Sequence, residues 1–588
     1  MNKNKIIYHF ISFSLLSITT SVNAADIAGA FDNYQSQSQR EVELLERERE
    51  KNNISRELKR EKEFQEKQQE TGSAIFLEEL GKNSELKFHI TKIIVDNDKK
   101  YEFSPKRTTI INKYINTNMG KNEILKLLVE LNNFYIAKGY TTTQVTIIPG
   151  NLKNGTLHFS VLWGKLNAFS VNGDTPSWRN KQRLFSAMPF STEKPINIQD
   201  VDQALDNLLR VSPKDGLKIT PTVKDGYSNI DLITQGFFPL SLSLGLNNSG
   251  THDSGWDQYT LNIMGKNLFG FNDTISFFQA WNDLDASRDR QKSKNLSYSM
   301  PLGYWLFDIN HYESYYKRKI KGNFGSYSSD GNSKRTSLKI SRLIYRNATG
   351  KFSGYVKTER RENLNKIENT VINVSSKKYA QFNSGLNYTG QIYDGWLYID
   401  GNVTFGIPWF SAAWKDDPDL AGFDLNYKKY NGTLNWFKDI YTTKNGRFAI
   451  NYAISSGFQF SPDILVSDAR YSLGDEYTIR GYKDDNVMAE NASYISQTLS
   501  FPVNIYKYSL RSISPFVGFD MGFAKRNCAV NSNQCKRDYM SGSAIGVNFY
   551  SQFVTASLTA GWPVTKPKSL KNNNIDHYNL YFRAGINF

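Results

Sequence analysis

The sequence contains little cysteine and little histidine, and this scarcity excludes several classes of site. Its 588 residues include two cysteines and six histidines. No His/Cys cluster has the spacing of metal ligands, so we expect neither a metal site nor a cofactor. His252, Asp253 and Ser254 are adjacent in a turn-like stretch, where they cannot easily form a serine-to-base relay. The sequence therefore argues against an enzyme.

A long apolar run is also missing after the first residues. Residues 1–24 contain Lys3 and Lys5, an apolar core and the compact segment Val22-Asn23-Ala24, which is the pattern of a secretory signal peptide. No later run reaches the ~18 apolar residues of a transmembrane helix. If the exported chain spans a membrane, closed β-structure is the remaining way to satisfy its backbone.

The formal net charge of +15 raises the question of nucleic-acid binding. The Lys and Arg residues are spread through loops and alternating segments and form no single basic face, so we expect no nucleic-acid partner. Basic residues that face anionic headgroups or a polar lumen explain the excess. An aromatic content of 14% suits the two aromatic girdles of a membrane barrel.

The C-terminal part, residues 237–588, has the alternation of a membrane-spanning β-barrel. In the last segment, Leu580, Phe582 and Ala584 alternate with Tyr581 and Arg583, so one face is apolar and the other is polar. About sixteen such segments follow one another, enough for roughly ten residues per tilted strand. The longest connection, about 461–492, is of a length that usually has a function.

The two cysteines, Cys528 and Cys535, lie in a polar stretch of this region. In an exported protein we expect them to form a disulfide that closes a short surface loop, with two free thiols as the alternative.

The charged segment that follows the signal has few apolar residues between Arg40 and Gln69. Such a segment cannot bury enough surface to fold alone. For residues 50–72 the pattern favours a solvated helix or a disordered linker. For residues 26–48 a helix enclosed by another part of the protein fits equally well.

Two small α+β modules are expected between this segment and the barrel, at residues 86–165 and 166–236. The first has helical apolar spacing over 121–138 and strand patterns around 88–95, 145–147 and 157–161. The second has a helix from Ile198 to Leu209 with Asn197 as its N-cap. Export and a barrel together place both modules in the periplasm of a Gram-negative cell.

Two motifs resemble the outer-membrane transporters of two-partner secretion, the TpsB branch of the Omp85 superfamily. Ile479-Arg480-Gly481-Tyr482 matches the tip motif of that family's sixth extracellular loop. The family's strand motif is matched by Phe519, Asp520 and Gly522, and the resemblance implies that these three residues lie on the lumen wall as partners of the loop. The resemblance implies a 16-stranded barrel, two periplasmic POTRA domains at 86–165 and 166–236, a plug helix at 25–48 and a charged linker at 49–85.

The resemblance also implies a mechanism. The sixth loop folds inward so that Arg480 reaches Asp520 on the lumen wall, where a guanidinium and a carboxylate can form a bidentate contact. The plug helix fills the lumen and leaves when the substrate arrives. The POTRA domains capture the N-terminal secretion domain of a large TpsA-type exoprotein, which is a toxin, haemolysin or adhesin and possibly a contact-dependent growth-inhibition toxin. We further expect contact with lipid and lipopolysaccharide, and a monomer.

Other barrel proteins fit the sequence less well. An outer-membrane insertase of the same superfamily, the main alternative, usually carries more POTRA domains than two. A TonB-dependent receptor needs a globular plug and more strands, and a passive porin does not need the modules before the barrel. The chain has no nucleotide-binding loop, so export without ATP is expected.

Overall fold

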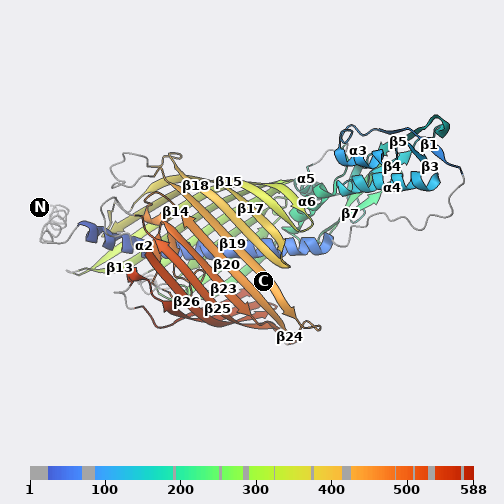
Figure 1. The fold of residues 1–588 in the computed structure, drawn as a ribbon. Coiled ribbons are helices and arrows are strands. Elements are labelled where there is room, and N and C mark those ends of the chain that lie inside the picture. Colours follow the sequence, from blue (N-terminus) through green and yellow to red (C-terminus); the bar gives the residue numbers. More distant parts are fainter. Residues whose placement is uncertain are drawn as a thin grey trace.

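The computed structural model describes residues 24–68, 86–189, 194–250, 255–282, 290–322, 325–372, 376–413, 425–483, 485–507, 510–527, 537–570 and 575–588. In chain order these residues form a long helix, two small α+β modules and a closed β-barrel. The helix runs through the barrel, and the modules lie beyond one end of it (Figure 1). None of the described helices is long and apolar enough to cross a membrane.

The N-terminal helix α2 is longer than the sequence predicted. It extends without a break over Ala24–Gln68, so the boundary at residue 48 is wrong and residues 49–68 of the expected linker are helical. Residues 1–23 of the expected signal peptide (1–24) and residues 69–85 of the expected linker lie outside the described part of the chain. The charged segment is ordered because the barrel wall supplies ionic partners that the segment itself lacks. Its few buried apolar side chains include Ile54 and Phe64.

The first module packs α4 against a small sheet. Its elements are β1 (Phe88–Ile90), β2 (Lys92–Asp96), α3 (Pro105–Asn112), β3 (Thr117–Met119), α4 (Lys121–Ala137), β4 (Gln144–Ile147) and β5 (Thr156–Leu162). The main sheet has the order β2-β5-β4. Leu127 and Leu131 of α4 pack with Leu157 and Phe159 of β5 in one core, because helical and strand periodicity each present one apolar face.

The second module repeats this arrangement and rests on the barrel. It contains β6 (Lys165–Val171), α5 (Trp178–Ala187), α6 (Ile198–Leu209), β7 (Gly216–Pro221) and β8 (Tyr227–Ile233), with sheet order β6-β8-β7. The Asn197 side chain accepts from the backbone N–H of Gln199, which confirms the predicted N-cap. Arg183 of α5 donates to Asn272, in the first short turn of the barrel, at 3.0 Å.

The two modules share a tight junction. The backbone N–H of Ile198 donates to the carbonyl of Gly139 at 2.8 Å, and Ile196 donates to Gly164 at 2.8 Å. The Asn197 side chain also donates to the carbonyl of Lys138 at 3.2 Å. The first turn of α6 is therefore bonded to the loop that follows α4, and the modules form one continuous body.

The barrel has sixteen antiparallel strands and closes through pairing of the last strand with the first. This confirms the predicted fold class. In the order of the chain the strands are β9 (Leu240–Asn247), β10 (Gln258–Lys266), β11 (Thr274–Trp281), β12 (Arg290–Leu302), β13 (Trp305–Gly322), β14 (Gly325–Asn347), β15 (Gly350–Ile367), β17 (Lys378–Ile392), β18 (Gly395–Ile407), β19 (Lys428–Thr442), β20 (Ala449–Phe460), β23 (Asn491–Ser500), β25 (Leu510–Lys525), β26 (Arg537–Ser551), β27 (Val554–Thr565) and β28 (Asn579–Asn587), with the short pieces β16 (Thr370–Val371) and β24 (Val503–Lys507) at their edges.

The barrel is apolar outside and polar inside. Leu244, Leu338 and Ile586 are exposed on the outer surface. Their neighbours along each strand face the lumen because side chains alternate. Lumen-facing Arg583 of β28 lies opposite Asn247 of β9, where the barrel closes.

Candidate functional site

The connection between β20 and β23, residues 461–490, is packed inside the barrel. Its root contains a short helical turn, η3 (Ser467–Ala469), and the hairpin of β21 (Tyr471–Leu473) and β22 (Val487–Ala489) carries its tip. Leu473, Ile479 and Tyr482 are fully buried and pack with wall residues of β23, β25 and β26. The long loop is therefore folded against the barrel wall, as the resemblance implied.

The loop tip is fixed to β25 by Arg480 and Asp520. The backbone N–H and the Nε of Arg480 both donate to one carboxylate oxygen of Asp520 at 2.8 Å, and Nη2 donates to the other at 2.6 Å. Nη1 donates to Thr498 at 3.1 Å and Nη2 to the carbonyl of Gln497 at 3.0 Å. Asp520 is fully buried and Arg480 is 8% exposed. Such a buried, bidentate contact is strong. Removing either partner leaves the other as an uncompensated buried charge, which is strongly destabilising.

The wall beneath the tip is made of glycines. A Cβ atom on any of them would overlap the loop, at 2.2 Å from Arg480 Nη2 for Gly518, 2.3 Å from Ile479 for Gly522, 1.8 Å from the Arg480 carbonyl for Gly542 and 2.7 Å from the Gly481 nitrogen for Gly561. The absence of side chains at these positions lets the loop backbone lie directly on the strands.

Gly481 and Tyr482 complete the tip. Gly481 has φ +100°, a conformation that other residues rarely adopt, and its carbonyl accepts from Asn579 at 2.8 Å. Tyr482 is buried, and its hydroxyl donates to the carbonyl of Thr565 at 2.7 Å. All four residues of the predicted tip motif therefore contact the wall.

One residue assigned to the lumen wall is misplaced. Phe519 is 41% exposed, on the face opposite Asp520 and Gly522, because adjacent strand residues point to opposite sides. Its expected role on the lumen wall is wrong. Cys528 and Cys535 lie outside the described residues, so their bridge stays a prediction. Within the described ranges, no group of three His, Cys, Asp or Glu residues could hold a metal ion.

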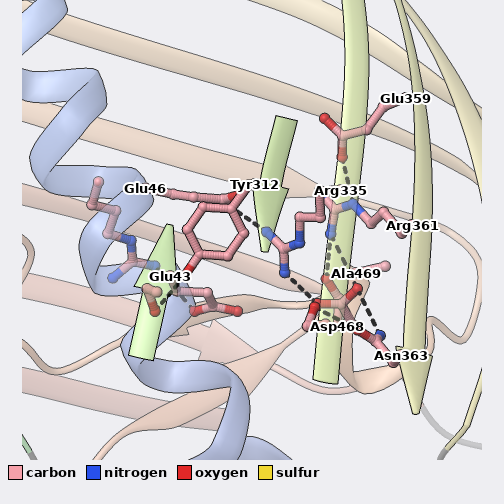
Figure 2. A network of polar contacts seen from close by, with 12 residues as sticks. Glu43, Glu46, Tyr312, Arg335, Glu359, Arg361, Asn363, Asp468 and Ala469 are labelled. Carbon is pink, nitrogen blue, oxygen red and sulfur yellow. Dashed lines mark hydrogen bonds and ion pairs between the residues drawn. The ribbon is translucent and has the colours of Figure 1, made fainter. Parts of the chain in front are cut away.

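A second anchor holds the root of the loop. Asp468 of η3 receives hydrogen bonds from Arg335 of β14 at 2.5 Å and from Asn363 of β15 at 3.3 Å, and it pairs with Arg361 at 3.4 Å (Figure 2). Tyr379 also donates to this carboxylate. The loop is thus attached at its tip to β25 and at its root to the opposite part of the wall.

Helix α2 contacts both the loop and the wall. Arg47 donates to Asp475 and to the carbonyl of Ser472 in the loop. On the other side of the loop, Arg583 of β28 pairs with Glu48 of α2 at 2.5 Å and with Glu476 at 2.7 Å. Near the second anchor, Arg335 pairs with Glu46 of α2 (Figure 2). Plug, loop and wall therefore share ionic partners.

A third ionic cluster lies at the periplasmic end, where the plug, α6 and the barrel meet. Asp206 of α6 is paired with Arg60 of α2 at 2.8 Å, with Arg346 of β14 at 2.7 Å and with Lys351 of β15 at 3.2 Å. Burial would raise the pKa of Asp206, but these three cations outweigh it and hold the pKa well below the ordinary value. Asp206 is therefore a charged link between the second module and the plug.

The sequence analysis missed Asp468, Asp206 and their cationic partners. Pairing between distant strands brings these residues together, and no local pattern reports such pairing. A usable signal was present in the plug itself, because Glu46, Glu50 and Glu57 recur at helical spacing.

The comparisons with known proteins agree with this architecture. The family model described as haemolysin secretion/activation protein ShlB/FhaC/HecB matches residues 226–549, more than half of the chain. A ShlB-type POTRA domain matches residues 88–164, and a further POTRA domain matches residues 165–221.

Similar whole proteins are found as well. The outer membrane transporter CdiB of Escherichia coli is 25% identical, over 85% of this chain and 82% of that protein. The hemolysin transporter protein HpmB of Proteus mirabilis is 24% identical, over 69% of this chain and 70% of that protein. The solved structure of CdiB from Escherichia coli has the same fold, with a TM-score of 0.82, 22% identity and coverage of 94% of this chain and 99% of that one.

Proposed function

This chain belongs to the ShlB/FhaC/HecB family of haemolysin secretion/activation proteins, the outer-membrane transporters of two-partner secretion, and we propose that it exports one large exoprotein through its own barrel. The POTRA domains take up the secretion domain of the exoprotein in the periplasm. The plug then leaves the lumen, and the exoprotein passes the sixth loop. The exoprotein is a toxin, haemolysin or adhesin, and the name of one relative, a hemolysin transporter, supports this range.

The observation that carries this proposal is the kind of contact that holds helix α2 in the lumen. Helix α2 is held mainly by ionic contacts such as Glu48 with Arg583 and Lys351 with Glu57. Such contacts can be exchanged for water when the helix moves, whereas an apolar core resists removal. A plug held in this way can leave without unfolding the barrel.

Capture of the partner is supported by the free sheet edges of the modules. In the described sheets β2-β5-β4 and β6-β8-β7, strands β2, β4 and β7 each pair with a single neighbouring strand, so each lies at a sheet edge. An extended segment of the exoprotein can pair with such an edge, and β-augmentation is a common way to bind peptides. The sequence contains no nucleotide-binding loop, so folding of the exoprotein outside the cell drives the export.

The proposal includes the surroundings of the protein. The apolar outer surface contacts lipid and, on the outer side, lipopolysaccharide, and the closed barrel acts as a monomer. It needs no nucleic acid and no catalytic activity of its own.

Co-expression with the adjacent large exported protein tests this function. Cells with both proteins are expected to release the exoprotein, and cells without this chain are expected to retain it in the periplasm. If other outer-membrane proteins decrease instead and no exoprotein is released, the chain is an insertase and the proposal is wrong.

A further inference from the structure

The lumen face of β14 and β15 carries an unusual density of cations. We call this set the cationic stripe; its members are Arg335, Lys339 and Arg346 of β14 and Lys351, Lys357 and Arg361 of β15. Five of the six alternate with Leu338 or Val356, which are exposed on the outer face, and therefore face the lumen. The register shift between Leu343 and Tyr345 turns Arg346 to the same side. Among the described residues of this lumen face, Glu359 is the carboxylate that accompanies them.

At two places in this stripe, two cationic residues lie directly opposite each other on the neighbouring strands. The register aligns Arg335 with Arg361 and Lys339 with Lys357. Like charges in directly opposed positions destabilise a sheet. Lys339 stacks on the ring of Tyr355, with Nζ 3.9 Å from the centroid, which offsets part of this cost. Asp468 of the loop and Glu359 of β15 offset part of the charge of Arg335, Arg361 and Lys357. The six cations of the stripe still outnumber these two carboxylates, which indicates a role toward an anionic occupant.

The plug presents a matching acidic face. Glu43, Glu46, Glu50, Glu57 and Glu61 are separated by three, four and seven residues and therefore lie on one side of α2. Glu46 pairs with Arg335, Glu57 with Lys351 at 2.5 Å and Glu61 with Arg346 at 3.4 Å. Lys357 is among the charges that act on Glu50. At rest the stripe is thus occupied by carboxylates along most of its length.

We infer that the cationic stripe is a carboxylate-binding track for the polypeptide in transit, which the acidic face of the plug occupies at rest. This inference rests on the proposed function. When the plug leaves, Arg335, Lys351 and Arg346 lose Glu46, Glu57 and Glu61 but keep Asp468 or Asp206 as a partner. Acidic side chains of the exported chain then take the three vacated places. Several weak contacts in a row retain a moving chain near the wall without trapping it. The same uncovered cations make the open pore selective for anions.

Planar-bilayer recording with the full-length chain tests this inference. The triple variant Glu46→Gln/Glu57→Gln/Glu61→Gln weakens the hold on the plug, so openings should become at least tenfold more frequent. The reversal potential of these openings in a KCl gradient should show preference for chloride. Adding Lys339→Gln and Lys357→Gln should reduce the chloride preference at least twofold. The outward-facing pair Lys292→Gln and Lys294→Gln removes the same charge from the other face and should change nothing.

Poly-L-glutamate and poly-L-lysine of equal length serve as probes on the periplasmic side. The glutamate polymer should block the openings of the triple variant, and the lysine polymer should not. Cation-selective openings, equal block by both polymers or a triple variant that stays closed would each overturn the inference. Secretion of the exoprotein by the same strains distinguishes the carboxylate-binding track from the proposed export function. Cation-selective openings together with normal secretion would refute only the track. A wild-type strain that secretes no exoprotein would refute the proposed function.

Discussion

The carbonyl oxygen of Arg480 lies 1.8 Å from the position that a Cβ atom on Gly542 would occupy. The loop tip and β26 are thus in direct backbone contact, and the wall cannot accept even a methyl group there. This contact places the loop backbone, and through it the guanidinium that reaches Asp520.

Gly542→Ala is therefore expected to lift the tip and to reduce secretion as strongly as Arg480→Ala, although the new side chain removes no charge. Gly401→Ala is the matched control, because a Cβ atom there meets nothing within 4 Å. Exoprotein in the medium gives the readout, and heat-modifiable migration in gels reports barrel assembly. Normal secretion by Gly542→Ala would show that the tip is not held as described.

Exchange of the two charges should fail to restore the contact. Asp520 accepts from the backbone N–H of residue 480 as well as from its side chain, so Arg480→Asp with Asp520→Arg leaves that donor facing a cation. We expect each single Ala variant and the double exchange to secrete poorly, with a loss of about 3–5 kcal/mol of local stability from the broken buried pair. Rescue by the exchange would mean that the side-chain pair alone matters.

Asp206→Asn should loosen the plug. It removes the carboxylate shared by Arg60, Arg346 and Lys351, which costs about 1.5–3 kcal/mol and raises the frequency of openings about tenfold or more. Asp225→Asn, on an exposed turn of the same module, is the control.

The difference in opening frequency between wild type and Asp206→Asn is expected to depend on pH. The pKa of Asp206 is lowered in the folded protein, so its contribution is present above the ordinary carboxyl range and is lost as the pH falls below about 4. Wild type and Asp206→Asn should therefore differ at pH 7 and converge only below about pH 4. Convergence at pH 6 would assign the contact to another group.

Asp468→Asn is expected to free the root of the sixth loop. Arg335 and Arg361 then lose the carboxylate between them, and the root should become sensitive to protease added to intact cells. Tyr379→Phe keeps that carboxylate and removes one donor, so its effect should be smaller, about 1 kcal/mol. Equal protease resistance of Asp468→Asn and wild type would argue against a second anchor.

Much of the fold could be read from local patterns. Alternation identified the sixteen strands, and apolar spacing identified α4 and α6, because burial on one face leaves a periodic trace. The same alternation should have excluded Phe519 from the lumen, since it is adjacent to Asp520. The motif resemblance was needed to bring Arg480 to Asp520, because the two belong to segments that no local period connects.

The ionic clusters could not be predicted in this way. Residues 49–68 resemble a linker or a solvated helix in the sequence, and the ionic contacts that hold this partly exposed helix against the wall come from distant strands. Arg335 and Arg361 become neighbours through strand register, which depends on the pairing of the whole sheet. Ion pairs between distant elements produce no local sequence pattern in either segment, so they cannot be predicted before the pairing of the strands is known.

The hydrogen bonds between the two modules couple the position of the first module to that of α6. The backbone N–H of Ile198 is hydrogen-bonded to Gly139 where α6 begins. We therefore expect the first module and α6 to move together when the first module is displaced. Asp206 lies on α6 beside the plug. We therefore expect a displacement of the first module, caused by binding of the exoprotein, to reach α2 through Asp206 and Arg60.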